Sequence, residues 1–106
     1  MDKIKNTQDI SFILMKPVAY TKCAIGQDWY KNELEIDFVP KDCYPDYMAV
    51  NEWIMKNIDG KEFNIEDVVE KIYDYLKEEY TPESLSVVDH IRGCKTHFDV
   101  DVIKQS

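Results

Sequence analysis

Apolar and acidic residues alternate strictly over residues 33–38, within a segment that runs from 29 to 39, and this pattern constrains the fold most. Leu34, Ile36 and Phe38 fall on one side, and acids at 33, 35 and 37 fall on the other. A period of two residues is typical of a strand with one buried face and one solvated face. Such a strand needs partner strands and a covering layer, so we expect the rest of the chain to supply both.

Three further segments read as strands. Residues 9–23 are rich in β-branched and aromatic side chains and predict a strand bent at Pro17, because proline cannot donate to a strand ladder. A turn at Gly26 would join it to the alternating segment as a hairpin. Residues 85–91 and 96–104 predict a second pair of strands.

Two helices are predicted between the strand pairs. Residues 47–58 and 65–79 carry apolar residues at spacings of three and four. Asp46 and Asn64 are good N-cap residues for these helices. Gly60 follows the first helix and can take the left-handed conformation that ends it.

The resulting order is β-β-α-α-β-β. Strands segregated from helices favour an α+β fold, here a four-stranded antiparallel sheet with both helices on one face. With 106 residues, we expect one domain spanning residues 1–106. The other face of the sheet stays uncovered, so it must meet water or another subunit.

Composition limits the function classes. The net charge is -8, and Arg92 is the only arginine, which weighs against a dedicated nucleic-acid binder unless an assembly gathers lysines on one face. No apolar run approaches the ~20 residues of a membrane span, and the N-terminus lacks the apolar region of a signal peptide. Three cysteines without metal or redox spacing favour a reduced, cytoplasmic protein.

Cys23 and Asp28 flank the turn of the first predicted hairpin. A thiol and a carboxylic acid so placed can act as nucleophile and proton donor. A lone cysteine is nevertheless more often a small buried residue, and an isolated aspartate is most simply a turn residue. Glu66, at the start of the second helix, is most simply a charge that favours the helix dipole. Residue types alone leave both interpretations open.

Usual metal and nucleotide motifs are absent from the sequence. His90, Cys94 and His97 lie on two predicted strands at irregular spacing, so we predict no metal site. The chain has no phosphate loop, no Gly-x-Gly-x-x-Gly and no Gly-x-Ser-x-Gly, so nucleotide binding through these motifs is not expected.

Two short strings resemble the 7-cyano-7-deazaguanine (preQ0) nitrile reductase family, QueF, of the tunnelling-fold (T-fold) superfamily. Residues 23–30, Cys-Ala-Ile-Gly-Gln-Asp-Trp-Tyr, are similar to the family's hairpin string Cys-Pro-Val-Thr-Gly-Gln-Pro-Asp-Phe. Residues 63–67, Phe-Asn-Ile-Glu-Asp, are similar to its Phe-His-Glu-Asp helix start. In this chain the hairpin string is shorter and lacks the second proline of the family string. Ile65 occupies the position of the family's histidine. The resemblance spans roughly residues 11–101.

The resemblance implies a T-fold and roles for three residues. Cys23 would attack a nitrile carbon as thiolate and form a covalent thioimide. Asp28 would supply a proton to the nitrile nitrogen, and Glu66 would accept hydrogen bonds from the guanine-like edge of the base.

The reductases also carry a Glu-Ser-Lys-Ser-like NADPH motif before their first helix. The matching residues 46–51 contain no lysine to neutralise phosphate, which implies that NADPH is not bound. The resemblance therefore narrows to the QueF-like branch, the amidinotransferases of archaeosine formation. Their cysteine thioimide is attacked by ammonia as co-substrate.

The expected protein is accordingly an enzyme of tRNA modification. It would convert the nitrile of 7-cyano-7-deazaguanine, free or in tRNA, into a formamidine, and would self-associate into a ring-shaped homo-oligomer without contacting a membrane. Two alternatives remain: an NADPH-dependent nitrile reductase, and a non-catalytic T-fold module that binds a purine or pterin. The acidic balance counts against tRNA, although several lysines lie near the cysteine turn.

Overall fold

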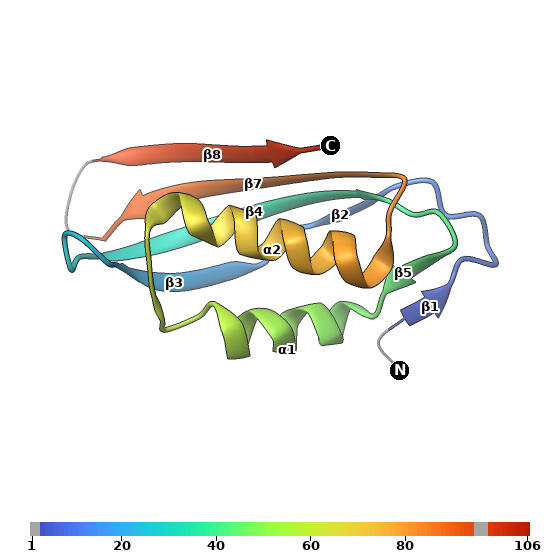
Figure 1. Cartoon of the computed structure of the whole chain (residues 1–106), viewed down its shortest axis with the longest axis horizontal. Helices are drawn as coiled ribbons and strands as arrows, with labels where there is room; N and C mark the ends of the chain where they lie inside the picture. Colours follow the sequence, from blue (N-terminus) through green and yellow to red (C-terminus); the bar gives the residue numbers. More distant parts are fainter. Residues whose placement is uncertain (1–2, 95–97) are drawn as a thin grey trace.

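The computed structural model describes residues 3–94 and 98–106. Figure 1 shows an elongated molecule with strands in one layer and both helices in front of it. The elements in chain order are β1 (Lys3–Lys5), β2 (Ile13–Met15), β3 (Val18–Cys23), β4 (Trp29–Val39), β5 (Cys43–Pro45), α1 (Tyr47–Asn57), β6 (Glu62–Phe63), α2 (Ile65–Tyr80), β7 (Ser84–Gly93) and β8 (Asp99–Gln105).

The main sheet has six strands. Its order is β6-β3-β4-β7-β8, and β2 also pairs with β4. All of these pairs are antiparallel except β3 with β6, which is parallel. The α+β class with two helices is therefore confirmed, but the prediction of a plain four-stranded antiparallel sheet is wrong. A short segment between the helices extends along β3 and adds the parallel strand, and β1 and β5 form a separate two-stranded sheet.

Pro17 divides the first predicted strand instead of bending it. β2 pairs with the far end of β4, where Ile13 lies opposite Phe38, and β3 pairs with the near end, where Val18 lies opposite Glu33. The Pro17 carbonyl still accepts a hydrogen bond of 2.9 Å from the Leu34 backbone N–H. Proline therefore interrupts the ladder only on the side where it lacks a donor.

The remaining predicted elements occur with shifted bounds. Both helices form, and the Asp46 side chain caps α1 by accepting from the Met48 backbone N–H at 3.0 Å. Asn64 occupies the N-cap of α2 without a capping hydrogen bond from its side chain. β7 and β8 form the second strand pair, while residues 96 and 97 of the predicted last strand lie outside the described residues.

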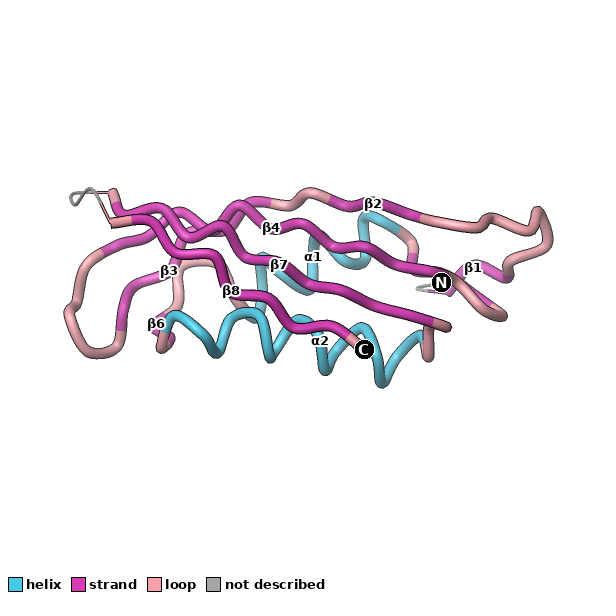
Figure 2. Tube along the Cα trace, turned by 90° about the horizontal axis from the view of Figure 1, so that it is seen from above, coloured by secondary structure: helices cyan, strands magenta, loops and turns pink. Residues whose placement is uncertain are grey.

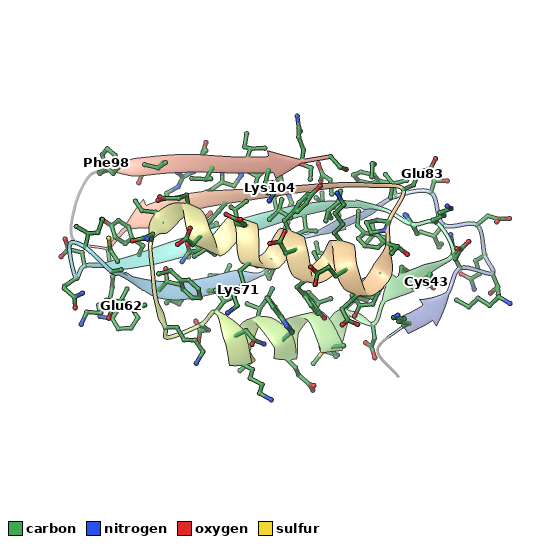
Figure 3. The ribbon with its side chains drawn as sticks, in the orientation of Figure 1. Cys43, Glu62, Lys71, Glu83, Phe98 and Lys104 are labelled. Carbon is green, nitrogen blue, oxygen red and sulfur yellow. The ribbon has the colours of Figure 1, made fainter. Side chains whose placement is uncertain are left out.

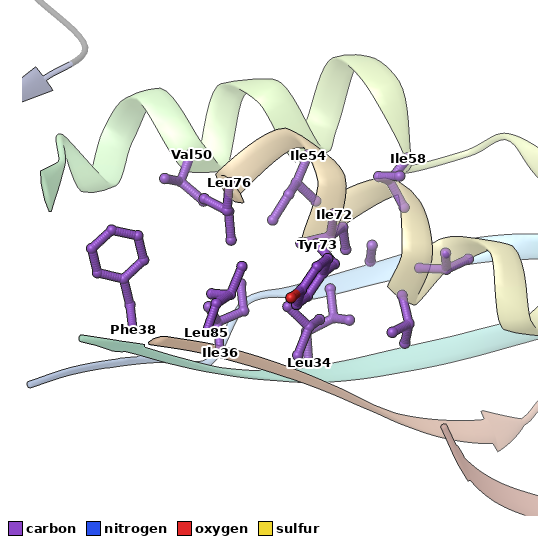
Figure 4. Close-up of a cluster of buried hydrophobic side chains, with 14 of the residues drawn as sticks. Leu34, Ile36, Phe38, Val50, Ile54, Ile58, Ile72, Tyr73, Leu76 and Leu85 are labelled. Carbon is purple, nitrogen blue, oxygen red and sulfur yellow. The ribbon is translucent and has the colours of Figure 1, made fainter. Parts of the chain in front are cut away.

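The core lies between the sheet and the helices. Leu34, Ile36 and Phe38 of β4 point toward the helix layer and are buried, as their alternation predicts. Figure 4 shows them against Val50 and Ile54 of α1, Ile58 just after that helix, and Ile72, Tyr73 and Leu76 of α2. Figure 2 shows the sheet from its edge, with α2 along one side of it, and Figure 1 shows both helices in front of the strands. In the described ranges, no helix is long and apolar enough to cross a membrane.

The opposite face of the sheet carries exposed charges. His90 and Arg92 of β7 both contact Asp101 of β8, with Nδ1 at 2.9 Å and Nη1 at 3.3 Å from its Oδ1. On β4, the Lys31 ammonium lies 3.7 Å from a Glu33 carboxylate oxygen. These contacts pair part of the acidic strand face, and its role in self-association stays a prediction.

Replacing Gly60 with alanine is expected to lower the free energy of unfolding by roughly 1 kcal/mol, because Gly60 has a φ of +75°. The Gly60 N–H also donates to the Tyr20 carbonyl at 2.7 Å, so the loop cannot relax freely. Urea unfolding measures the change. Gly26→Ala is the control: a β-carbon there meets only Asp28 Oδ2, at 3.8 Å, and should change stability little. Equal losses in the two variants would contradict the backbone argument.

Candidate active site at the β3–β4 turn

The β3–β4 turn brings the two predicted catalytic residues to its base. The Cys23 backbone N–H donates to the Asp28 carbonyl at 2.8 Å, and the Gln27 N–H donates to the Cys23 carbonyl at 2.9 Å. Gln27 takes a left-handed conformation, with φ of 63°, which lets so short a loop reverse. The loop is therefore closed by backbone bonds, and Cys23 and Asp28 face each other across it.

The Cys23 thiol and the Asp28 carboxylate both lie beside Gly26. The Gly26 N–H donates to Cys23 Sγ at 3.5 Å. A methyl group on Gly26 would lie 3.8 Å from Asp28 Oδ2, so the carboxylate occupies the flank of the same residue. Cys23 and Asp28 are both half-buried. The turn thus places a nucleophile and an acid around one peptide unit, with a backbone donor aimed at the sulfur.

Tyr30 belongs to the same neighbourhood, and the sequence interpretation missed it. Its pKa is raised above the usual value, chiefly by burial and further by the negative charges of Cys23 and Asp28. Its place agrees with this influence, because Tyr30 lies opposite Thr21, two residues before Cys23 on β3. The available signal was the strand alternation, because Tyr30 continues the inward-facing positions of Asn32 and Leu34 to the end of β4 that adjoins the turn.

β6 brings the second motif beside the first. Cys23 is the register partner of Phe63, and the Ala24 N–H donates to the Phe63 carbonyl at 3.0 Å. The Gln27 side chain also donates to Glu62 Oε1 at 3.2 Å. Figure 3 shows Glu62 at the end of the molecule where β3 turns into β4. Two strings that lie forty residues apart in the chain therefore meet at one end of the sheet.

Glu66 lies close to this end but does not join the thiol. It is exposed in the first turn of α2, three residues beyond Phe63. Among the contacts of the described chain, Glu66 has no hydrogen bond or ion pair with Cys23 or Asp28. The structure therefore brings Cys23 and Asp28 together and leaves Glu66 facing outward.

The residues considered as metal ligands are spread apart. His90 lies on the open face of the sheet and is bonded to Asp101, whereas Cys94 is exposed after β7 and its N–H donates to the Trp29 carbonyl at 3.2 Å. His97 lies outside the described residues. Within residues 3–94 and 98–106, no group of three or more His, Cys, Asp or Glu side chains is arranged to hold a metal ion.

A mostly apolar cleft of about 350 Å³ lies at the other end of β3, beside the start of α1. Its lining includes Met15, Lys16, Pro17, Tyr47 and Asn51. Three residues of the lining, Tyr47, Val50 and Asn51, come from residues 46–51, the segment that the resemblance aligns with the NADPH motif of the reductases. Lys16 is the one cationic side chain in that lining, so the cleft offers little to a multiply charged phosphate group.

Comparison with solved structures gives an informative match. No protein-family model matches the chain, and no curated protein matches its sequence. The crystal structure of the archaeosine synthase QueF-Like in the apo form aligns with 92% of this chain and 94% of its own, at a TM-score of 0.71 and 18% sequence identity. The chain therefore has the fold of the archaeosine synthase QueF-Like, as the strings around Cys23 and Glu66 implied.

Proposed function

We propose that this protein is a QueF-like amidinotransferase. It converts the nitrile of 7-cyano-7-deazaguanine, free or in tRNA, into a formamidine with ammonia. The observation that carries the proposal is the Cys23 thiol, which is half-buried beside Asp28 in a chain with the archaeosine synthase QueF-Like fold. The nitrile is an electrophile suited to a thiolate, and the adjacent acid supplies the proton that the attack requires.

The first half of the reaction forms the thioimide. The Cys23 thiolate attacks the nitrile carbon, and one electron pair of the triple bond moves to nitrogen. Asp28, entering as the carboxylic acid, gives its proton to that nitrogen and becomes a carboxylate. The Gly26 N–H donates to Sγ at 3.5 Å, and this contact holds the sulfur beside the acid.

The second half returns both groups to their starting states. Ammonia adds to the thioimide carbon, and the Asp28 carboxylate takes one proton from the incoming nitrogen. The carbon–sulfur bond then breaks, the Cys23 thiolate leaves, and the formamidine is released. Nothing is oxidised or reduced, so no hydride donor is needed. The lack of lysine in residues 46–51 is consistent with a reaction that needs no NADPH.

Glu66 is assigned the recognition of the base. A carboxylate accepts two N–H bonds from a guanine-like edge, and such charge-assisted bonds are strong. Because Glu66 is exposed at the end of the sheet, it is free to bind a base held by its own chain or by a neighbour. We propose a ring of subunits in which Cys23 of one chain faces Glu66 of the next. Such a ring would also cover the unpaired edges of the sheet.

Intact-mass measurement tests the covalent step. Wild-type protein mixed with 7-cyano-7-deazaguanine should gain the whole mass of the nitrile, and Cys23→Ala should gain none. Cys94→Ala is the matched control, because Cys94 is an exposed thiol at the same end of the molecule, and it should still form the adduct. Ammonia should then discharge the wild-type adduct as the formamidine. An adduct on Cys23→Ala would refute the mechanism, and NADPH consumption would favour the reductase.

A further inference from the structure

We propose that the Tyr30 hydroxyl donates a hydrogen bond to the nitrile nitrogen and stabilises the negative charge that develops there as Cys23 attacks. This role rests on the proposed function and adds a residue to its site. It differs from the role of Asp28, because Tyr30 keeps its proton throughout. Three features support this role: the position of Tyr30, its free hydroxyl and the geometry of a nitrile.

Strand register places Tyr30 on the same face as the thiol. Tyr30 is the partner of Thr21 across the β3–β4 ladder, and Cys23 follows Thr21 by two residues on β3. Residues two apart on a strand share a face, and a diagonal neighbour on the adjacent strand is within reach of an aromatic side chain. Asp28 stands just before β4, where its carbonyl accepts from the Cys23 N–H, so all three residues lie at the same end of the sheet.

The Tyr30 hydroxyl is uncommitted. In the part of the chain that the structure describes, it makes no hydrogen bond, and none joins it to Cys23 Sγ. Burial, together with the negative charges of Cys23 and Asp28, raises its pKa, so the phenol keeps its proton at neutral pH. It can therefore act as a hydrogen-bond donor both before and after Asp28 has given up its proton.

The geometry of the reaction favours a donor that is close to the sulfur but not bonded to it. The sulfur attacks the nitrile carbon, and the nitrile nitrogen lies one bond farther away. A hydrogen-bond donor for that nitrogen must therefore be separated from Sγ by at least the length of that bond. Tyr30 meets this condition, since it is the diagonal neighbour of Cys23 across the β3–β4 ladder and forms no hydrogen bond with the sulfur. A fixed donor aimed where charge develops can contribute on the order of 10²-fold in rate.

Rates of adduct formation test this role. With 7-cyano-7-deazaguanine at saturation, Tyr30→Phe should form the Cys23 adduct roughly 100-fold more slowly than wild type. The nitrile concentration for half-maximal rate should change little, because the charge is absent from the bound ground state. Tyr20→Phe is the matched control, since Tyr20 is on the opposite face of β3, 47% exposed, and its loss should leave the rate unchanged.

Alkylation of Cys23 by iodoacetamide separates this role from a structural one. That reaction places no charge on a nitrile nitrogen, so wild type and Tyr30→Phe should be alkylated at Cys23 at equal rates. Slowing of both reactions by the same factor would show that Tyr30 only shapes the turn and would overturn the proposal. Equal adduct rates in wild type and Tyr30→Phe would overturn it while leaving the proposed function intact. Absence of the adduct from wild type would overturn both.

Discussion

Replacing Asp89 with asparagine is expected to stabilise the protein at pH 8 and to remove most of the fall in its stability between about pH 4 and 7. Asp89 is 0% exposed and lies on the helix-facing side of β7, opposite Leu34. Among the described residues, neither carboxylate oxygen has a hydrogen-bond partner. Burial is the main reason that its pKa rises from 3.8 to about 7, while Arg92 lowers it and Asp101 raises it to lesser extents.

The direction of the pH effect follows from proton binding. In the unfolded chain Asp89 loses its proton near pH 3.8, whereas in the folded chain it keeps it to about pH 7. Between these values the folded state binds one more proton, so the free energy of unfolding falls by about 1.4 kcal/mol per pH unit. The contribution of Asp89 is thus fully present below about pH 4 and lost as the pH rises through 7, for a total on the order of 4 kcal/mol. Asparagine carries no charge at any pH, so the Asp89→Asn variant lacks this pH-dependent contribution to stability.

Urea unfolding at several pH values from 5 to 8 measures the effect as the difference between wild type and Asp89→Asn. Taking the difference cancels the contributions of all groups that are common to both proteins. Asp99→Asn serves as the matched control, because Asp99 is exposed on β8, and it should keep the wild-type pH dependence. Identical slopes for wild type and Asp89→Asn would show that Asp89 is ionised and solvated in the fold.

The inward position of Asp89 also marks a limit of sequence interpretation. The burial of Leu34, Ile36 and Phe38 is predictable because acids occupy the positions between them. Along β7, apolar side chains such as Val88 also occur on the outward face. The alternation therefore does not indicate which residues of β7 point inward. Only pairing with β4 determines that Asp89, and not its neighbours, faces the helices. The buried Asn32 escaped notice for a similar reason, because its polarity suggests the solvated face.

Long-range pairing was the other part of the fold that the sequence did not reveal. β6 is a two-residue strand, Glu62–Phe63, which is too short to show any periodicity. It forms because the segment between the helices runs alongside β3 in the same direction. There the Lys22 N–H donates to the Lys61 carbonyl at 2.9 Å. Such a contact depends on how the helices pack, and local propensity carries no information about it.

The candidate site was predictable where it is local. Cys23 and Asp28 are held by one turn, so their proximity follows from a hairpin that the sequence already indicated. Tyr30 required a further step, because its nearness to both depends on the register of β3 against β4. The position of Glu66 relative to the turn depends on how α2 packs, and its role in base recognition remains a prediction.

Phe38→Ala is expected to cost about 3–5 kcal/mol of stability, which is the typical loss for truncating a buried aromatic side chain. Phe38 is 0% exposed and lies between β4 and the helices, with its ring 6.3 Å from that of Tyr80 in an edge-to-face arrangement. Figure 4 shows its ring directed toward the helix layer. Denaturant unfolding should show most of this loss, and Phe38→Leu should recover much of it by refilling the volume. Phe12→Ala is the control, since Phe12 is 54% exposed and should change stability far less.

The same variant separates stability from catalysis. β4 carries Phe38 at one end and Tyr30 at the other, so truncation at Phe38 removes packing without touching the turn that holds Cys23. Folded Phe38→Ala molecules should therefore form the adduct at the wild-type rate, and total activity should fall only in proportion to the unfolded fraction. A ligand that binds only the folded state should restore part of the loss by mass action. A lower rate per folded molecule would instead mean that packing at the far end of β4 sets the position of Tyr30.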